Sequence, residues 1–175
     1  MNGKYKALDI ANLYIQLAND MPNDSIDNLK LNKLCYYAQA WSLARLGYPL
    51  FDETIEAWKY GPLIRSVYYT FNVCGKNPIE EPSYHFDESN LTSDELSLVT
   101  DVYITYGKYT SGALIDKTHT QGSPYDLVYV EDQNQPIPEE LMKSYFAKSN
   151  ELESMRLNLS PDAENFAPRL IEVIK

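Results

Sequence analysis

The sequence is poor in cysteine, histidine and glycine, and each shortage excludes a class of protein. Its 175 residues include two cysteines, two histidines and seven glycines. Cys35 and Cys74 form no CxxC pair, so neither a structural zinc site with four ligands nor a disulfide scaffold is expected. We expect both to be small buried residues. The glycines are scattered and form no phosphate-binding loop. The sequence therefore predicts neither a metal nor a cofactor.

Long apolar runs are missing as well. The longest uninterrupted one, Leu34–Ala38, is far shorter than the roughly 20 residues that cross a bilayer. The basic first residues are followed by Asp9, Asn12 and Gln16, so this segment is not expected to act as a signal peptide. These features predict a cytoplasmic protein that does not contact a membrane.

Basic residues are scarce in the second half of the chain. Residues 1–76 carry eight basic and seven acidic side chains, whereas residues 77–175 carry seven basic and eighteen acidic ones, for a net charge of −10 overall. Such a surface repels phosphate backbones, so we expect no binding to nucleic acid. Two interpretations stay open: an acidic face that keeps the protein soluble, or one that attracts a basic protein partner.

Apolar residues recur at helical spacing through most of the chain, which predicts a mainly α fold. Thr92 and Glu95 have the spacing of a capping box, and Pro22 and Gly47 stand where helices should end. The expected helices span residues 7–19, 29–46, 63–73, 92–107, 110–117 and 139–148, with one or two helical turns at 125–130.

Residues 55–60 favour a strand, because they alternate in polarity and include β-branched and aromatic side chains. Gly61 and Pro62 are expected to break it, with Pro62 in the first turn of the next helix. The acidic connection 77–90 has no helical period.

The overall prediction is a compact single-domain helical bundle with a small antiparallel β element. Residues 1–148 form this domain. Residues 149–175 form a C-terminal extension, with weak helical and strand-like signals, that either packs on the domain or contacts a specific partner.

Catalytic motifs are absent too. There is no GxSxG, no HExxH and no Cys–His nucleophile pattern. His119 lies close in sequence to Asp116, so a hydrolase that uses this pair is one alternative. The other is a histidine that only makes hydrogen bonds at a helix end, and His85 is expected to be exposed in a loop. We predict that the protein is not an enzyme.

Tyrosine, by contrast, is abundant, with 15 residues. Its large ring and polar end favour recognition surfaces. Together with nearby basic residues, the aromatics could stack on single-stranded nucleic acid, but the near-neutral local charge argues against that. Core packing is expected for Trp41 and Trp58, and a protein-binding patch for the rest. The cluster comprises Tyr36, Tyr37, Trp41, Trp58, Tyr60, Tyr68 and Tyr69.

Several segments resemble conserved blocks of one family. Residues 29–39, LKLNKLCYYAQ, are similar to LKLQKLLYFAQ, and residues 49–62, PLFDETIEAWKYGP, are similar to PLF.E.IEAW.YGPV. Residues 7–15, 114–129 and 137–146 match further blocks in the same order. Asn32 stands where Gln is common, Cys35 where Leu is common, and Tyr125 where Trp is usual. On these blocks the chain resembles the Panacea family, the SocA-like antitoxin domain, over about residues 5–148.

The resemblance implies an antitoxin of a type II-like toxin–antitoxin system, often phage- or mobile-element-associated, that neutralises a toxin protein by direct binding. We expect that toxin to be basic and encoded by an adjacent gene. The alternative is a proteolytic adaptor that delivers its partner to a Clp-type protease. Lys33 either packs over tyrosine rings with its ammonium in water or meets a carboxylate at an interface. The residues expected to bind the partner are Lys33, Tyr37, Trp58, Lys59, Tyr60 and Arg65.

Overall fold

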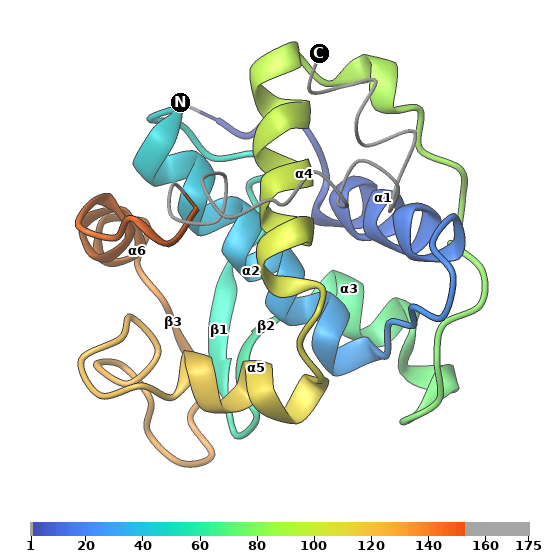
Figure 1. Cartoon of the computed structure of the whole chain (residues 1–175). Helices are drawn as coiled ribbons and strands as arrows, with labels where there is room; N and C mark the ends of the chain where they lie inside the picture. The colour runs from blue at the N-terminus through green and yellow to red at the C-terminus, as the bar shows by residue number, and fades with distance from the viewer. Residues whose placement is uncertain (1, 153–175) are drawn as a thin grey trace.

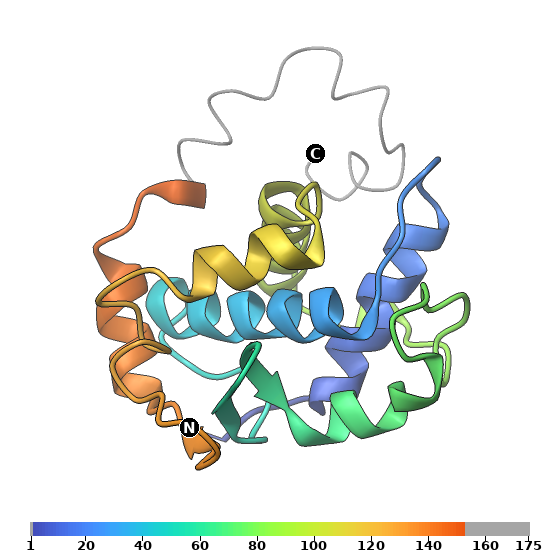
Figure 2. The ribbon, with the colours of Figure 1, turned by 90° about the horizontal axis from the view of Figure 1, so that it is seen from below.

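Helix α2 (Asn28–Arg45) lies at the centre of the computed structural model, which describes residues 2–152. It contacts the other five α-helices and strand β2. Figure 2 shows α4 and α5 on one side of α2, with α3 and the β-strands on the opposite side and α6 beside one end. The five surrounding helices are α1 (Ala7–Asn19), α3 (Arg65–Thr70), α4 (Ser93–Tyr106), α5 (Ser111–Thr118) and α6 (Glu139–Ala147), all labelled in Figure 1.

A small antiparallel sheet has the strand order β2-β1-β3. In the hairpin of its first two strands, Ile55 is opposite Ile64 and Trp58 is opposite Gly61. The mainly α fold with a small antiparallel β element is thus confirmed. The strands are β1 (Ile55–Trp58), β2 (Gly61–Ile64) and β3 (Gln135–Pro136).

Strand β1 ends before Gly61, as predicted, but the prediction that Pro62 lies in the first turn of a helix is wrong, because Gly61 and Pro62 begin β2. Gly61 has φ +99°, a conformation that glycine adopts without strain, and it lets the chain reverse after Tyr60. Pro62 is tolerated since β2 is an edge strand, where a missing N–H is not needed by a neighbour. Helix α3 consequently begins at Arg65 and ends at Thr70, followed by the 3-10 turn η1 (Asn72–Cys74).

The other helix predictions hold to within about two residues. The Thr92–Glu95 capping box forms with both of its reciprocal hydrogen bonds at the start of α4. Residues 125–130 form hydrogen-bonded turns rather than a helix. Cys35 is buried as expected, whereas Cys74 is only half-buried.

The polar side chains of α1 hold the segment 79–86 against the helix. Asn12 accepts a hydrogen bond from the Ser83 amide at 2.9 Å, and Gln16 bonds both the amide and the carbonyl of Phe86 at 2.8 and 3.0 Å. These contacts satisfy backbone groups that have no partner in a helix or sheet. They fix an acidic segment on the surface, where Glu80 and Glu81 are exposed.

Glu95 is a buried carboxylate that ties the N-terminal segment to α4. It accepts hydrogen bonds from Lys4 (2.7 Å), Tyr5 (2.7 Å), Tyr48 (3.0 Å) and the Thr92 amide (2.9 Å). Burial by itself raises the pKa of Glu95, but these hydrogen bonds outweigh it and lower the pKa to about 2.

We expect Glu95→Gln to lower the free energy of unfolding by about 2 kcal/mol at pH 7, because the buried donors lose a charged acceptor. Since the folded pKa lies below the usual value near 4.5, the stabilisation is complete above pH 4.5 and is lost as the pH falls toward 2. Urea unfolding of both proteins at pH 7 and at pH 3 measures this. Asp94→Asn, on the exposed side of the same helical turn, is the control; a deficit of equal size at both pH values would contradict the prediction.

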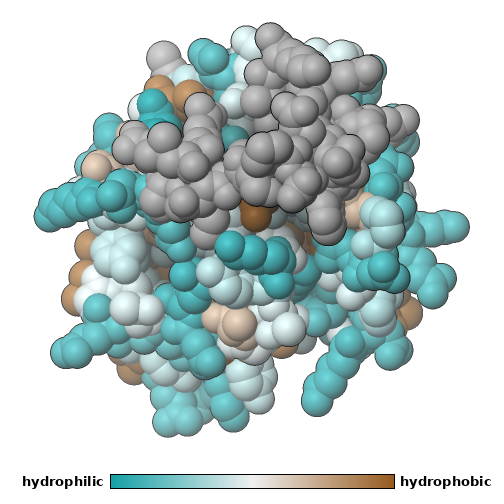
Figure 3. Space-filling view, viewed as in Figure 1, coloured by the Kyte–Doolittle hydropathy of each residue, from teal (hydrophilic) through white to brown (hydrophobic). Residues whose placement is uncertain are grey.

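The described chain ends against the domain. Leu152 is buried, and Glu151 accepts a hydrogen bond from Tyr106 at 2.8 Å and pairs with Lys117 at 3.0 Å. The expected boundary at residue 148 stays a prediction, since residues 153–175, with the signals expected there, lie outside the described residues. Within residues 2–152, no helix is long and apolar enough to cross a membrane. In the view of Figure 3, hydrophobic residues appear only as scattered patches among hydrophilic ones.

Candidate functional site

The six residues expected to bind a partner fall into two groups. Lys33 and Tyr37, on α2, are buried. The other four lie on the β1–β2 hairpin and the start of α3, where Lys59, Tyr60 and Arg65 are exposed and Trp58 is half-buried. The sequence predicts Trp58 in the core, but Trp58 is only half-buried, because it lies next to the two-residue turn of the hairpin.

The exposed group is extended by two tyrosines of α3 into what we call the hairpin surface. Tyr60 is 54% exposed and Tyr69 is 57% exposed. The Trp58 ring contacts those of Tyr68 and Tyr69, with centroids 5.6 and 6.5 Å apart. The surface consists of Trp58, Lys59, Tyr60, Arg65, Tyr68 and Tyr69.

Polar contacts hold the Trp58 ring of the hairpin surface in place. Glu56 accepts hydrogen bonds from the Trp58 indole at 2.8 Å and from Arg65 Nε at 2.9 and 3.0 Å. The Arg65 guanidinium lies 5.6 Å from the centre of the Trp58 ring. Because Glu56 neutralises Arg65, the ammonium of Lys59 is the free cation of the hairpin surface itself.

Lys33 supports the hairpin from below. Its Nζ donates a hydrogen bond of 3.1 Å to the Pro62 carbonyl, and the side chain is 0% exposed. Neither expected arrangement of Lys33 is found among residues 2–152, since the side chain is fully buried and its ammonium has no carboxylate of these residues within hydrogen-bond distance. Burial lowers the pKa of Lys33 to about 7, with the charge of Asp27 as a smaller opposing effect.

The hairpin turn rests on the segment after α5. The Tyr125 hydroxyl donates to the Trp58 carbonyl at 2.9 Å, and the Tyr125 ring stacks on His119 with centroids 4.3 Å apart. An added Cβ at Gly61 would lie 2.6 Å from Lys33 Cε and 2.8 Å from the Thr118 hydroxyl. Three sequence blocks, 29–39, 49–62 and 114–129, therefore meet at the base of this hairpin.

Two further side chains of α2 explain the polar positions of the first block. Asn32 accepts a hydrogen bond from the Ile64 amide at 2.9 Å, at the outer edge of β2. Gln39 accepts from the Leu50 amide at 2.8 Å and donates to the Phe51 carbonyl at 2.8 Å. Both amides are buried and connect α2 to the segment that leads into the hairpin.

The structure does not support the hypothesis that His119 and Asp116 form a catalytic pair. His119 stands at the C-cap of α5 with its ring against Tyr125, and no hydrogen bond joins it to Asp116 within the described chain. Burial and the charge of Lys33 lower the pKa of His119. Among residues 2–152, no group of three or more His, Cys, Asp or Glu side chains could hold a metal ion.

Sequence reasoning missed the residues that fix the hairpin surface. Glu56 and Tyr125 have no distinguishing spacing; only the fold brings Tyr125 beside Trp58. Tyr36 and Tyr37, by contrast, could have been noticed in the sequence. They are consecutive on one helix, so if both are buried their hydroxyls need separate surroundings.

The comparisons with known proteins agree with the sequence blocks. The family described as "Antitoxin SocA-like, Panacea domain" matches residues 31–124. Antitoxin SocA of Caulobacter vibrioides (strain NA1000 / CB15N) is 30% identical over 130 residues, which cover 68% of this chain and 68% of that protein. No solved structure matches the chain significantly. The chain belongs to the SocA-like, Panacea-domain family of antitoxins.

Proposed function

We propose that this protein is an antitoxin that neutralises a protein toxin by direct binding, and that the hairpin surface is the contact. The observation that carries this proposal is the cluster of Trp58, Tyr68 and Tyr69, whose rings contact one another, together with the exposed Tyr60 on the hairpin turn. Tryptophan, tyrosine and arginine dominate binding energy at protein interfaces. Rings that are already held by their neighbours lose little conformational freedom on binding.

The edge of the sheet supports binding through side chains. An exposed edge strand can add a strand from a partner. Here the Ile64 amide is taken by Asn32 and the Pro62 carbonyl by Lys33. With these two groups of β2 occupied, we infer that a toxin meets the rings of the hairpin surface rather than the main chain of β2.

The charge of the chain favours a basic toxin. The acidic segment held over α1 exposes Glu80, Glu81 and Asp87, and complementary charge speeds the encounter of two proteins. The first candidate for the toxin is therefore the product of an adjacent gene, provided that this product is basic. We expect the two proteins to meet in the cytoplasm.

The proposal is tested by expressing this neighbouring gene in cells, alone and together with this protein, and measuring growth. We expect the neighbour alone to arrest growth and co-expression of this protein to restore it. Tyr60→Ala combined with Tyr69→Ala should abolish rescue and weaken the measured affinity at least about 100-fold, since hot-spot rings each contribute about 2 kcal/mol. Titration calorimetry with the purified toxin measures the affinity.

Tyr84→Ala is the matched control, because Tyr84 is an exposed tyrosine outside the hairpin surface, bonded to Asp9. Thermal unfolding should show both variants folded. Full rescue and unchanged affinity in the double variant would contradict the hairpin surface as the contact. Rescue that disappears in cells without a Clp-type protease, with loss of the toxin protein, would instead identify a proteolytic adaptor.

A further inference from the structure

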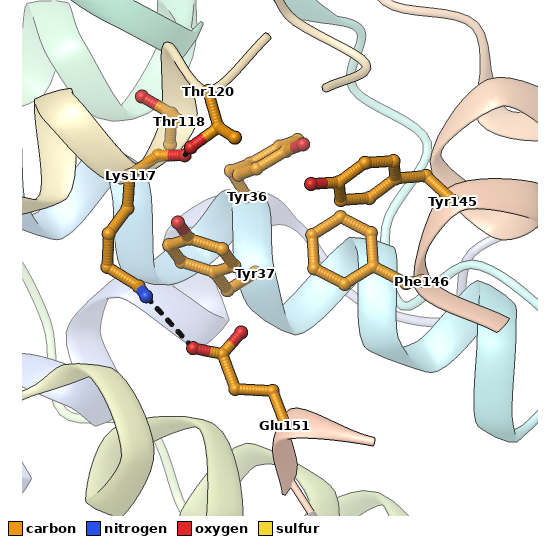
Figure 4. A pocket seen from close by; sticks show the side chains of 8 residues that line it. All are labelled: Tyr36, Tyr37, Lys117, Thr118, Thr120, Tyr145, Phe146 and Glu151. Atoms are coloured by element: carbon orange, nitrogen blue, oxygen red, sulfur yellow. Dashed lines mark hydrogen bonds and ion pairs between the residues drawn. The ribbon is translucent and has the colours of Figure 1, made fainter. Parts of the chain in front are cut away.

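A pocket of about 100 Å³ opens between α2, α5, α6 and Glu151, and none of its lining residues belongs to the hairpin surface. We call it the tyrosine pocket. Figure 4 shows the rings of Tyr36 and Tyr37 in it, with Tyr145 and Phe146 opposite. Its lining residues are Tyr36, Tyr37, Lys117, Thr118, Thr120, Tyr145, Phe146 and Glu151.

Two buried tyrosines present unused hydroxyls to this pocket. Tyr36 is 2% exposed and Tyr37 is 4% exposed. No hydrogen bond joins either hydroxyl to another atom of the described chain, and neither oxygen is among the fully enclosed unpaired atoms, so both hydroxyls open into the pocket. A polar group that enters the pocket from outside can therefore bond them.

The rings that carry these hydroxyls are fixed. Tyr37 stacks on Tyr106 with centroids 3.7 Å apart and planes 6° apart. Phe146 packs edge-on against both Tyr36 and Tyr37, at 6.0 Å from each. The two hydroxyls are therefore held in position before any ligand arrives.

Each free phenol of the pocket has one hydrogen bond to donate, and its oxygen can also accept one. Burial raises the pKa of both Tyr36 and Tyr37, so each phenol keeps its proton. Thr118 and Thr120 use their protons on the carbonyls of Ile115 and Lys117, and so add no donor.

The charges of the pocket also favour an acceptor. Glu151 is already engaged by Lys117 at 3.0 Å and by the Tyr106 hydroxyl at 2.8 Å. The Lys117 ammonium keeps N–H donors beyond that ion pair, because an ammonium has three. A group that accepts hydrogen bonds from the two phenols and carries negative charge toward Lys117 therefore suits the pocket.

We propose that the tyrosine pocket binds a carboxylate group through the hydroxyls of Tyr36 and Tyr37, with Lys117 as the adjacent cation. A volume of about 100 Å³ holds roughly three water molecules, or a carboxylate on a short aliphatic stem against the rings. The carboxylate belongs either to a free organic acid or to an Asp or Glu side chain of a bound protein. The second source rests on the proposed function; the first does not.

Titration of the full chain with sodium acetate tests the pocket without a toxin. Ring-labelled tyrosine signals are followed by NMR against sodium chloride at equal ionic strength. We expect saturable shifts at Tyr36, Tyr37 and Tyr145, and no saturable shift with acetamide, which has the same shape without the charge. Equal responses to acetate and acetamide, or none to either, would overturn the proposal.

The double variant Tyr36→Phe, Tyr37→Phe keeps both rings and removes both hydroxyls. With the Tyr145 signal as the readout, this variant should bind acetate at least about tenfold more weakly. One hydrogen bond to a charged group contributes about that factor in affinity. Tyr14→Phe is the control, because it removes a buried hydroxyl that bonds Val99 outside the pocket. Acetate affinity equal to that of the unmodified protein in the double variant would overturn the assignment to these hydroxyls.

A second experiment, with the purified toxin, identifies the source of the carboxylate. If a toxin side chain fills the pocket, the double variant weakens toxin binding and acetate competes with the toxin. If a free acid fills it, acetate binds and toxin affinity is the same in both proteins. If the neighbouring gene is harmless, the proposed function fails. The acetate titration still shows whether the tyrosine pocket binds a carboxylate.

Discussion

Replacement of Lys33 by methionine is expected to remove a large pH dependence from the stability of this protein. Lys33 is 0% exposed, and burial lowers its pKa from 10.5 to about 7. Between these two values the unfolded chain binds the proton and the folded chain does not. Stability therefore rises with pH in this window, and the cost of burying the lysine is greatest below pH 7.

The size of the effect follows from the pKa shift. In the unmodified protein, Lys33 should cost about 5 kcal/mol at pH 6 and about 2 kcal/mol at pH 9. Methionine removes this cost but leaves the Pro62 carbonyl without its donor, which offsets about 2 kcal/mol. Lys33→Met should thus be more stable than the unmodified protein by about 3 kcal/mol at pH 6 and equal to it at pH 9.

Urea unfolding at pH 6, 7, 8 and 9 measures both proteins. Lys76→Met, at an exposed lysine, is the control for losing one lysine. A constant difference between the Lys33→Met variant and the unmodified protein over this range would show that Lys33 does not change protonation on folding.

Gly61→Ala is expected to lower the free energy of unfolding by about 3–4 kcal/mol, from two independent causes. The residue has φ +99°, which is unfavourable for alanine. Its new Cβ would also lie 2.6 Å from Lys33 Cε and 2.8 Å from the Thr118 hydroxyl, so the buried base of the hairpin would have to move. Urea denaturation at pH 8 measures the loss.

A second glycine separates the two causes. Gly47 has φ +83°, but an added Cβ there would have no atom within 4 Å. Gly47→Ala should therefore cost only about 1 kcal/mol, from the backbone alone. If both variants lose the same stability, Gly61 serves the turn and does not hold a close contact with Lys33.

Much of the fold could be predicted from local patterns. Apolar residues at helical spacing located α1 to its observed bounds, and the capping box located the start of α4. The hairpin could not be predicted in this way. Gly61-Pro62 begins a helix in many sequences and an edge strand in others, and the choice depends on whether β1 and a donor such as Asn32 lie beside it.

The candidate site, too, could be predicted from the sequence only in part. The aromatic cluster was visible in the sequence, including the four rings of the hairpin surface, and Lys59 and Arg65 were among the residues expected to bind a partner. Which rings face outward was not visible, because Tyr36 and Tyr68 have the same chemistry and differ only in what packs on them. Both sequence-based expectations for Lys33 place its ammonium at the surface, since lysine is rarely buried. The Pro62 carbonyl that binds it comes from a segment 29 residues away.

The sequence by itself determined the fold class, the helices and the family, because these depend on periodicity, caps and ordered blocks that lie close together in the chain. Only the tertiary structure decided which block residues support the fold and which remain accessible. Burial and hydrogen bonding are set by neighbours distant in sequence, so the buried Lys33, the outward-facing hairpin surface and the unpaired hydroxyls of the tyrosine pocket became apparent only when α2, the hairpin, α5 and α6 were placed together.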